Sequence, residues 1–140
     1  MDKQEIERIV NTYGDGLLRL GYSYFKNTAD AEDACQTSFI KIIKHGKNFE
    51  NKRQEKTFVY KVMANTCKDM LRNPWRKSFS LEHAGEIEEP EERQDSVIYG
   101  VNQLETKYRT IIYLYYYEGY KADEIGKILK IPQSTVYTRL

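Results

Sequence analysis

Residues 119–140, GYKADEIGKILKIPQSTVYTRL, contain two short helical patterns separated by a tight connection. Ile125, Ile128 and Leu129 fall at positions i, i+3 and i+4, which places them on one apolar stripe of a helix. Gly126 lies inside this pattern, where glycine destabilises a helix by about 1 kcal/mol relative to alanine. Close approach of a second helix would explain why glycine is tolerated there. Pro132 then begins the second helix, since the missing N–H of proline is not needed at a first helical position.

The second helical pattern predicts one buried face and one exposed face. Val136 and Leu140 are spaced i, i+4 and are expected to point inward. The side chains expected to point outward together are Gln133, Ser134, Tyr137 and Thr138. A helix-turn-helix with hydrogen-bonding groups near the start of its second helix is typical of proteins that read the major groove of duplex DNA. A helical hairpin that only packs is the alternative, since short motifs have false positives.

The charge of the chain is divided into blocks of opposite sign, although the total is only +1. Residues 1–80 carry 15 Lys and Arg against 10 Asp and Glu, residues 81–98 carry one against seven, and residues 99–140 carry six against four. A basic body and a mildly basic tail are therefore separated by an acidic segment. Blocks of this kind are informative about charged partners, where a total near zero is not.

The hydrophobic periodicity predicts an all-α chain with room for one or two small domains. We expect long helices over residues 3–26, 28–44, 57–72 and 104–117, and a short helix through Val101. Residues 46–56 are expected to form a loop. The predicted organisation is an N-terminal helical domain (1–77), an acidic linker (78–97) and a C-terminal helix-turn-helix domain (98–140). Most tyrosine rings between residues 113 and 120 are expected to fill the small core beneath that motif.

The helix expected over residues 28–44 has an unusual exposed face. Its buried stripe is expected to consist of Ala31, Ala34, Cys35, Phe39 and Ile42. On the opposite face, Ile40 is surrounded by Asp33, Gln36 and Thr37. A single exposed isoleucine is common, but one ringed by polar side chains also fits the centre of a protein–protein contact. The pattern alone favours neither interpretation.

The helix expected over residues 57–72 separates an apolar face from a basic one. The apolar face carries Val59, Val62, Met63, Thr66 and Met70, and the basic face carries Lys61, Asn65, Lys68 and Arg72, with Asp69 beside them. Residues 41–77 hold 11 basic and three acidic residues, interleaved with Phe49, Phe58, Tyr60 and Trp75. Positive charges that bind phosphates and rings that stack on bases suit a nucleic-acid strand, and Asn65 and Asp69 can read base edges. A solvated basic face is the alternative.

Several classes of function are not indicated. The sequence offers no clustered carboxylates, nucleophile–base pair or metal-ligand set, so we expect no catalytic residues, no metal and no cofactor. Cys35 and Cys67 lie in apolar helical patterns and are expected to be buried thiols in a reducing cytosol. No apolar run reaches the length of a membrane span, and the N-terminus lacks a signal-peptide core. We therefore expect a cytoplasmic protein without membrane insertion.

Four segments occur in one order: DAEDACQTSFIKIIK (30–44), TFVYKVMANTCKDMLR (57–72), the acidic linker, and YRTIIYLYYYEGYKADEIGKILKIPQSTVYTRL (108–140). Together they resemble the extracytoplasmic-function (ECF) sigma factors of the sigma-70 family, which are two-domain bacterial transcription initiation factors. The resemblance covers essentially the whole chain. It implies that residues 1–77 are sigma region 2, that residues 98–140 are sigma region 4, and that the protein binds RNA polymerase and opens promoters. An ordinary helix-turn-helix regulator that binds duplex DNA without polymerase is the alternative.

The resemblance also implies three binding surfaces. The clamp helices of the polymerase beta-prime subunit would be bound by Asp30, Asp33, Gln36, Thr37 and Ile40. The minus-ten promoter element would be captured as a single strand by Lys52, Arg53, Lys61, Asn65, Lys68, Asp69 and Arg72. The minus-35 element would be read as duplex by Gln133, Ser134, Thr135, Tyr137, Thr138 and Arg139. An anti-sigma factor that covers the DNA and polymerase surfaces is a further implied partner.

The sequence departs from the family pattern at three places. Phe58 stands where tryptophan is usual, and Lys121 stands where a serine or threonine cap is common, so we expect a less well capped helix there. The family's recognition helix continues for further turns, whereas this sequence ends at Leu140. We expect a C-terminally truncated region 4, in either a trimmed chain or a naturally short protein, with weakened minus-35 binding.

Overall fold

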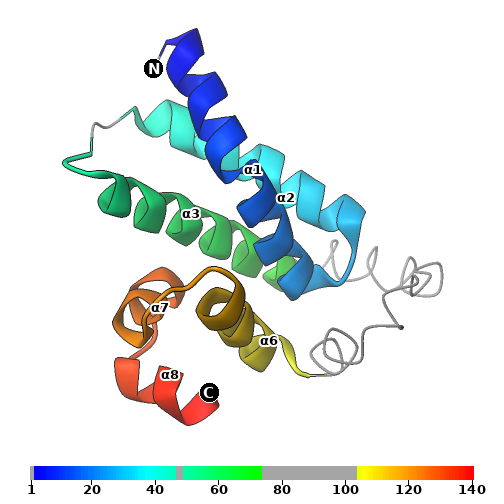
Figure 1. The fold of residues 1–140 in the computed structure, drawn as a ribbon. Coiled ribbons are helices and arrows are strands. Elements are labelled where there is room, and N and C mark those ends of the chain that lie inside the picture. The colour runs from blue at the N-terminus through cyan, green and yellow to red at the C-terminus, as the bar shows by residue number, and fades with distance from the viewer. Residues whose placement is uncertain (1, 47–48, 74–103) are drawn as a thin grey trace.

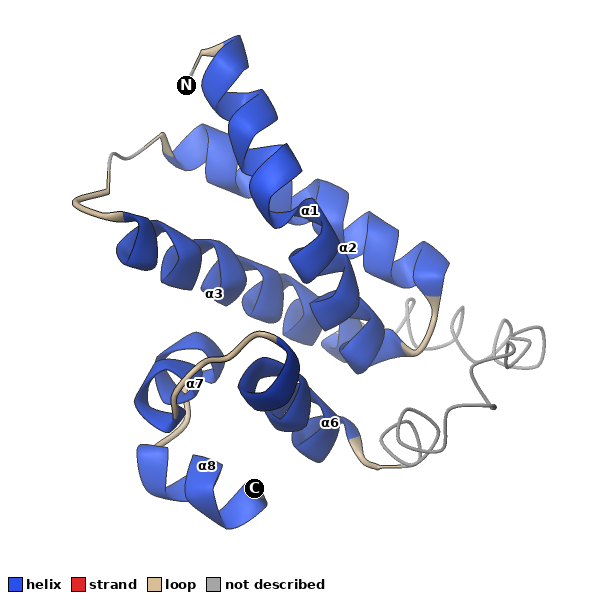
Figure 2. Ribbon diagram, in the orientation of Figure 1, coloured by secondary structure: helices blue, strands red, loops and turns tan. Residues whose placement is uncertain are grey.

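The structure is a computed structural model that describes residues 2–46, 49–73 and 104–140. The described part is all-helical, as predicted (Figures 1 and 2). Its elements are α1 (Lys3–Phe25), α2 (Thr28–His45), α3 (Lys52–Arg72), α6 (Thr106–Ile112), the π-helical turn η2 (Tyr113–Tyr117), α7 (Ala122–Leu129) and α8 (Gln133–Arg139). The acidic linker and the short helix expected through Val101 lie outside the described residues.

Side-chain caps determine where the three N-terminal helices begin. Each capping oxygen accepts a hydrogen bond from the backbone N–H three residues later, which would otherwise lack a partner within its helix. The caps are Asp2, Asn27 and Asn51, with distances of 2.8, 3.3 and 2.8 Å. Because Asn51 caps α3 and good helix formers follow it, α3 begins at Lys52 and not near residue 57 as the sequence predicted. Lys52 and Arg53 therefore lie in the first helical turn and not in a loop.

The N-terminal and C-terminal helices share one hydrophobic core. Figure 1 shows α1, α2 and α3 packed together, with the C-terminal helices (α6, η2, α7 and α8) beneath α3. Helix α7 packs against α3, and α6 packs against α1. Apolar side chains of both groups belong to a single buried cluster, among them Leu17, Val59, Met63, Leu114, Ile125 and Val136. The two groups of helices that the sequence assigned to separate domains therefore pack against each other in this structure.

One carboxylate, Glu55, connects the start of α3 to α1. Its two oxygens each accept a hydrogen bond from the Arg8 guanidinium at 2.9 Å, and Oε1 also accepts one from the Tyr13 hydroxyl at 2.7 Å. The hydrogen bonds from Arg8 and Tyr13 outweigh the effect of burial and hold the pKa of Glu55 below its ordinary value. This contact fixes the turn of α3 that carries Lys52 and Arg53.

We expect Glu55→Gln to lower the free energy of unfolding at pH 7 by about 2 kcal/mol, because hydrogen bonds to charged groups contribute about 1.5–3 kcal/mol and Arg8 is half exposed. The pKa of Glu55 is lowered in the folded state. Its contribution is therefore complete above the unfolded-state pKa of about 4.3 and is lost as the pH falls through the folded-state value. Urea denaturation of both proteins at pH 7 and near pH 3 measures the difference.

The control for this substitution is Glu7→Gln, which neutralises an exposed carboxylate on α1. We expect it to leave the unfolding midpoint almost unchanged at both pH values. A loss of stability equal to that of Glu55→Gln, or a loss for Glu55→Gln that persists undiminished at low pH, would contradict the assigned role of Glu55.

Candidate nucleic-acid interface

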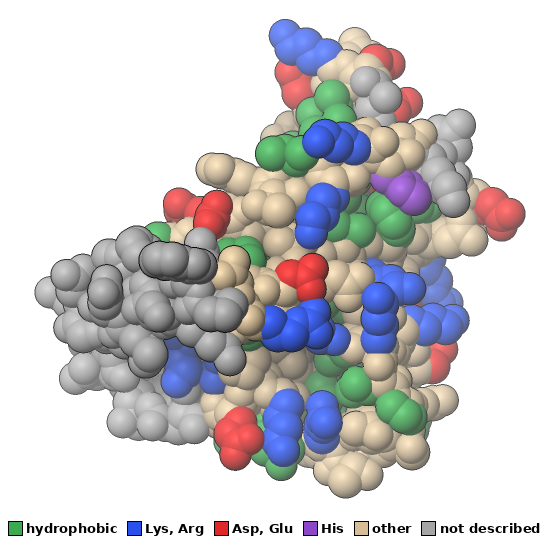
Figure 3. Space-filling view, turned by 180° about the vertical axis from the view of Figure 1, so that it is seen from behind, with side chains coloured by type: hydrophobic (Ala, Val, Ile, Leu, Met, Phe, Trp, Pro, Cys, Tyr) green, Lys and Arg blue, Asp and Glu red, His purple; other side chains and the backbone are tan. Residues whose placement is uncertain are grey.

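The basic stripe predicted on α3 lies along a side of the helix that the C-terminal helices partly cover. Lys52, Arg53, Asp69 and Arg72 are exposed, whereas Lys61, Asn65 and Lys68 are half-buried. Figure 3, which views the molecule from behind, shows Lys and Arg side chains gathered over the lower half of that face. The structure thus keeps a positive surface in this part of the molecule, and phosphates are the anions that such surfaces bind.

Two basic side chains of α3 are bound by the C-terminal helices, which the sequence did not predict. Arg53 Nε donates to Glu124 Oε2 of α7 at 3.1 Å. Lys68 Nζ donates to the main-chain carbonyl oxygen of Leu129, at the C-terminal end of α7. Helix C-termini attract cations because their carbonyl groups carry partial negative charge. Arg53 and Lys68 were expected to bind DNA, but in this structure they bind a carboxylate and the C-terminal end of a helix.

The C-terminal half of α3 faces further positive charge. Burial lowers the pKa of Lys68, and the neighbouring charges of Lys130, Arg72 and Arg139 lower it further. Lys130 follows α7 and Arg139 ends α8, so basic residues from both halves of the chain meet here. Arg72 also pairs with Asp69 one turn earlier on α3. The positive charges of this cluster (Lys68, Arg72, Lys130 and Arg139) repel one another, and Asp69 and the Leu129 carbonyl oxygen offset part of that repulsion.

The aromatic side chains interleaved with this charge have protein partners. Phe58 packs against His45 and Phe49, with ring centroids 4.6 and 5.2 Å away, where the loop joins α2 to α3. Tyr60 is buried and meets Tyr120 edge-on at 5.4 Å. Trp75 lies outside the described residues. In this structure the described rings stabilise the fold, and stacking on bases stays a prediction.

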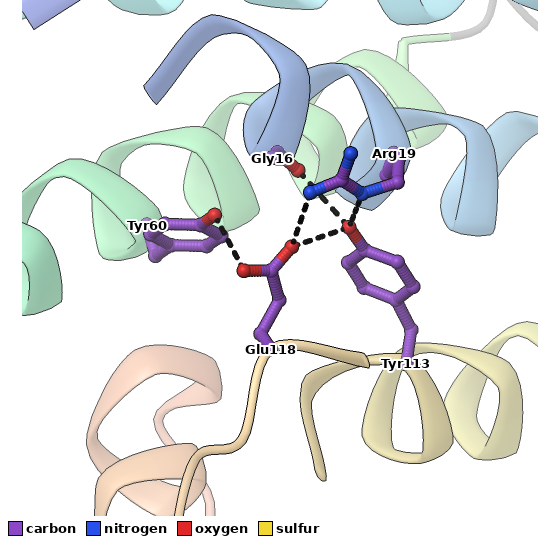
Figure 4. A network of polar contacts seen from close by, with 5 residues as sticks. All are labelled: Gly16, Arg19, Tyr60, Tyr113 and Glu118. Carbon is purple, nitrogen blue, oxygen red and sulfur yellow. Dashed lines mark hydrogen bonds and ion pairs between the residues drawn. The ribbon is translucent and has the colours of Figure 1, made fainter. Parts of the chain in front are cut away.

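A polar network centred on Glu118 joins the C-terminal helices to α1 and α3 (Figure 4). Glu118 accepts hydrogen bonds from the hydroxyls of Tyr113 and Tyr60, at 2.6 and 3.1 Å. It also forms an ion pair with Arg19 at 3.3 Å. Arg19 Nε also donates to the Tyr113 hydroxyl at 2.9 Å. A Cβ atom at position 16 would lie 1.9 Å from the Tyr60 hydroxyl, so Gly16 leaves the space that this contact needs.

The environment of Glu118 favours its charged form. Burial alone would raise the pKa of this carboxyl, but the hydrogen bonds from Tyr113, Tyr60 and Arg19 outweigh burial and lower the pKa. No signal in the sequence identified this residue, because Arg19, Tyr60 and Glu118 are far apart in the chain. Only the packing of the two halves brings them together.

The helix-turn-helix forms as predicted from α7 and α8. Gln133, Ser134, Tyr137 and Thr138 are exposed, while Thr135 and Arg139 are half-buried and Val136 is buried. Of the pair expected to point inward, Leu140 is 45% exposed, since it follows the last residue of α8. The predicted minus-35 residues therefore share a largely accessible face.

Two local contacts fix the geometry of this motif. A Cβ atom on Gly126 would lie 2.8 Å from the carbonyl oxygen of Ile131, so the chain that enters α8 passes too close for a side chain. This explains the glycine within the helical pattern. At the start of α7, Glu124 Oε1 accepts a hydrogen bond from the Lys121 N–H at 3.0 Å. This contact is one half of a capping box and compensates for the absent serine or threonine.

On α2, four of the five residues predicted to bind polymerase lie on one accessible face, and the fifth, Asp30, does not. Ile40 is 54% exposed, Asp33 and Gln36 are exposed, and Thr37 is half-buried. Asp30, by contrast, is buried at the start of α2, where it accepts a hydrogen bond from Asn27 Nδ2 at 3.1 Å. The structure therefore brings four of the five predicted residues to one accessible surface and separates Asp30 from them.

The expectation that most of the clustered tyrosines fill the core is wrong. Tyr113 and Tyr120 are buried, but Tyr115, Tyr116 and Tyr117 are 40, 70 and 54% exposed. The π-helical turn is the physical reason, because its wider hydrogen bonds break the 3.6-residue period. The Glu118 N–H bonds to the Tyr113 carbonyl oxygen at 3.2 Å, five residues back. Such π-helical turns are frequent at functional sites.

Other expectations concern thiols, metals and membranes. Cys35 and Cys67 are buried and free, and burial raises the pKa of Cys35 to about 11. Among residues 2–46, 49–73 and 104–140, no group of three or more His, Cys, Asp and Glu side chains is placed to hold a metal ion. No helix in the same ranges is long and apolar enough to cross a membrane.

Comparison with known proteins gives two family matches and several relatives that align with most of this chain. Residues 9–77 match Sigma-70 region 2, and residues 95–140 match Sigma-70, region 4. The chain is 30% identical to RNA polymerase sigma factor SigV of Bacillus subtilis, over 94% of this chain and 81% of that protein. It is 28% identical to the ECF RNA polymerase sigma factor SigW of the same organism, over 99% of this chain and 84% of that protein.

A solved structure has the same fold. CnrH, in complex with the cytosolic domain of CnrY, is similar with a TM-score of 0.69 at 20% sequence identity, covering 99% of this chain and 82% of the CnrH chain. The likeness therefore extends over the N-terminal and the C-terminal helices.

We expect Gly126→Ala to destabilise the protein by about 1–3 kcal/mol, the usual effect of overpacking, because the Ile131 carbonyl leaves no room for a methyl group. The control is Gly14→Ala in α1, where a Cβ atom would meet nothing within 4 Å. That change should stabilise the protein by about 0.5–1 kcal/mol through better helix propensity. Urea denaturation of the two variants measures both effects. If Gly126→Ala proved as stable as Gly14→Ala, the close approach at the turn would be disproved.

Proposed function

Because this chain belongs to the sigma-70 family, as an ECF-type transcription initiation factor that works with RNA polymerase and recognises promoters, we propose specific roles for its surfaces. Sigma factors are not enzymes, since the polymerase carries out the chemistry. The chain therefore contributes only binding free energy. An ordinary helix-turn-helix regulator is not favoured, because the region 2 match accounts for helices that such a regulator would not need.

The stripe on α3 holds the minus-ten element as a single strand. The observation that carries this proposal is the alignment of Asn65 and Asp69 with Lys61, Lys68 and Arg72 along one side of α3. Cations along this side of the helix can bind phosphates, while an amide and a carboxylate can bind the edges of an unpaired base. Removing a base from the stack costs a few kcal/mol. A site that binds only the unpaired form offsets this cost and shifts the promoter toward the open state.

The helix-turn-helix binds the minus-35 element as duplex. The exposed side chains at the start of α8, Gln133 and Ser134, followed by Tyr137 and Thr138, suit major-groove contacts. We assign residues 1–77 to region 2, residues 78–97 to the linker and residues 98–140 to region 4, in keeping with the matches at 9–77 and 95–140. Two modest sites joined by one chain reinforce each other through effective concentration once both are bound.

The exposed face of α2 binds the beta-prime clamp helices of core polymerase. Ile40 supplies an apolar centre, and Asp33 and Gln36 supply a polar rim, which is the usual anatomy of a protein–protein contact. An anti-sigma factor is a further partner, and the complex of CnrH with the cytosolic domain of CnrY supports it. We place the chain in the cytoplasm, where polymerase and promoter DNA meet.

We expect the double variant Asn65→Ala, Asp69→Ala to reduce open-complex formation at least about tenfold, because a base contact contributes about 1–3 kcal/mol. Purified core polymerase with a promoter template, probed by permanganate reactivity of unpaired thymines, measures this. The matched control is Asn11→Ala, Asp15→Ala, which removes an exposed amide and carboxylate at the same spacing on α1. Equal open-complex formation by the two double variants would refute the role proposed for α3.

To test the polymerase contact, we expect Ile40→Asp to weaken binding to core polymerase by at least about tenfold. Replacing an apolar side chain at the centre of an interface typically costs about 2 kcal/mol of binding free energy. Val10→Asp is the matched control, since Val10 is an exposed apolar side chain on α1. Fluorescence anisotropy of the labelled factor with core polymerase compares the two. Equal affinities would show that the α2 face does not bind polymerase.

A further inference from the structure

The basic cluster (Lys68, Arg72, Lys130 and Arg139) is built by three separate segments of the chain. Lys68 and Arg72 are one turn apart on α3, which places their Cβ atoms about 6 Å from each other. Lys68 binds the carbonyl oxygen of Leu129, and Lys130 is the next residue, so the end of α7 lies against this turn of α3. Arg139 ends α8, which packs against α7. Positively charged side chains therefore converge where these helices meet.

The described residues compensate only part of this positive charge. Asp69 pairs with Arg72, and these two side chains stay largely exposed, at 61 and 72%. Within the described part of the chain, no ion pair involves Lys130 or Arg139. Burial lowers the pKa of Lys68, and the like charges around it lower the pKa further. The cluster therefore keeps an excess of positive charge that an anion can neutralise.

The backbone at Lys130 gives an observation that does not depend on electrostatics. This residue follows α7 with a φ of 59°, in the left-handed region. Glycine is the usual residue at such a position, because a side chain is unfavourable in that conformation. The Lys130 side chain is exposed. The chain therefore carries a positive charge at this junction at a cost in backbone energy.

The chemistry of the cluster suits an anion with several charged oxygens. Guanidinium groups bind phosphate oxygens through paired N–H donors, and ammonium groups bind them as point charges. Lys68 has further N–H donors besides the one that binds Leu129. A di- or triphosphate group presents charged oxygens along its whole length, so it can reach cations on two helices at once. Because lysine and arginine side chains carry donors only, the cluster recognises the phosphates and not a base attached to them.

We propose that the basic cluster is a binding site for an oligophosphate group, a diphosphate or a triphosphate, at the junction of α3 with the end of α7. Lys68 and Arg72 bind it from α3, and Lys130 binds it from the other side. Free polyphosphate and nucleoside triphosphates share this chemistry. The site is separate from the promoter contacts proposed above, because Lys130 belongs to none of them and because α3 alone does not complete it.

Isothermal titration calorimetry of the full chain with inorganic tripolyphosphate, at constant ionic strength, tests the site. We expect saturable binding at a single site. Sulfate at the same ionic strength should give no saturable binding, because one tetrahedral anion does not reach both helices. Adenosine triphosphate identifies the source of the phosphates. Affinity equal to that of tripolyphosphate indicates that phosphates alone are recognised, and higher affinity indicates a nucleotide.

Two substitutions approach the site from its two sides. Lys130→Gln should weaken tripolyphosphate binding about tenfold, because it removes a charge-assisted contact. Arg72→Gln should weaken it by a similar factor from α3. The matched control is Lys44→Gln, which removes an exposed lysine near the end of α2, before α3 begins and away from the cluster. This control should keep the affinity of the unmodified chain. Far-UV circular dichroism checks that all three variants keep their helix content.

Three results would overturn the site. The first is an absence of saturable tripolyphosphate binding. The second is an equal loss of affinity for Lys44→Gln and Lys130→Gln, since binding would then be a general attraction to positive charge. The third is a loss for Arg72→Gln without one for Lys130→Gln, because the anion would then bind α3 alone. None of these results bears on the promoter contacts, which are measured with polymerase and DNA.

Discussion

The carboxylate of Glu118 is the contact on which the arrangement of the two halves depends. A nearly buried carboxylate is unfavourable unless hydrogen bonds satisfy it, and here Tyr113, Tyr60 and Arg19 do so from three different elements. Tyr113 belongs to the same turn as Glu118, but Tyr60 and Arg19 come from α3 and α1. The charge is therefore well accommodated only when α1, α3 and the C-terminal helices are together. A network of this kind favours one docking geometry over others more than it adds net stability.

Much of the fold follows from local patterns in the sequence. The bounds of α1 and α2, the position of the turn between α7 and α8, and the packing of Val136 all agree with hydrophobic periodicity. Gly126 was predicted to permit a close approach, and the Ile131 carbonyl makes that approach. The family matches confirm the sigma-70 interpretation reached from four motifs in order. These features are local, so a window of a few turns contains the information that determines them.

The features that the sequence did not reveal involve long-range contacts or departures from helical periodicity. Asp30 follows the pattern of an exposed face, but its side chain is drawn into the capping contact with Asn27. Tyr115, Tyr116 and Tyr117 were expected inside, but the π-helical turn alters the period after Ile112. Arg53 and Lys68 were correctly placed on a basic surface, but their partners lie 71 and 61 residues away. The amphipathic pattern of α3 cannot show that a second group of helices covers part of its polar side.

The basic cluster of Lys68, Arg72, Lys130 and Arg139 makes ionic strength relevant to the shape of the protein. Like charges repel over about 8 Å at physiological salt, so dilute buffer strengthens the repulsion at this end of the molecule and concentrated buffer screens it. Salt also weakens phosphate contacts by counterion release. The C-terminal helices should therefore pack against this end of α3 more stably in concentrated salt than in dilute buffer.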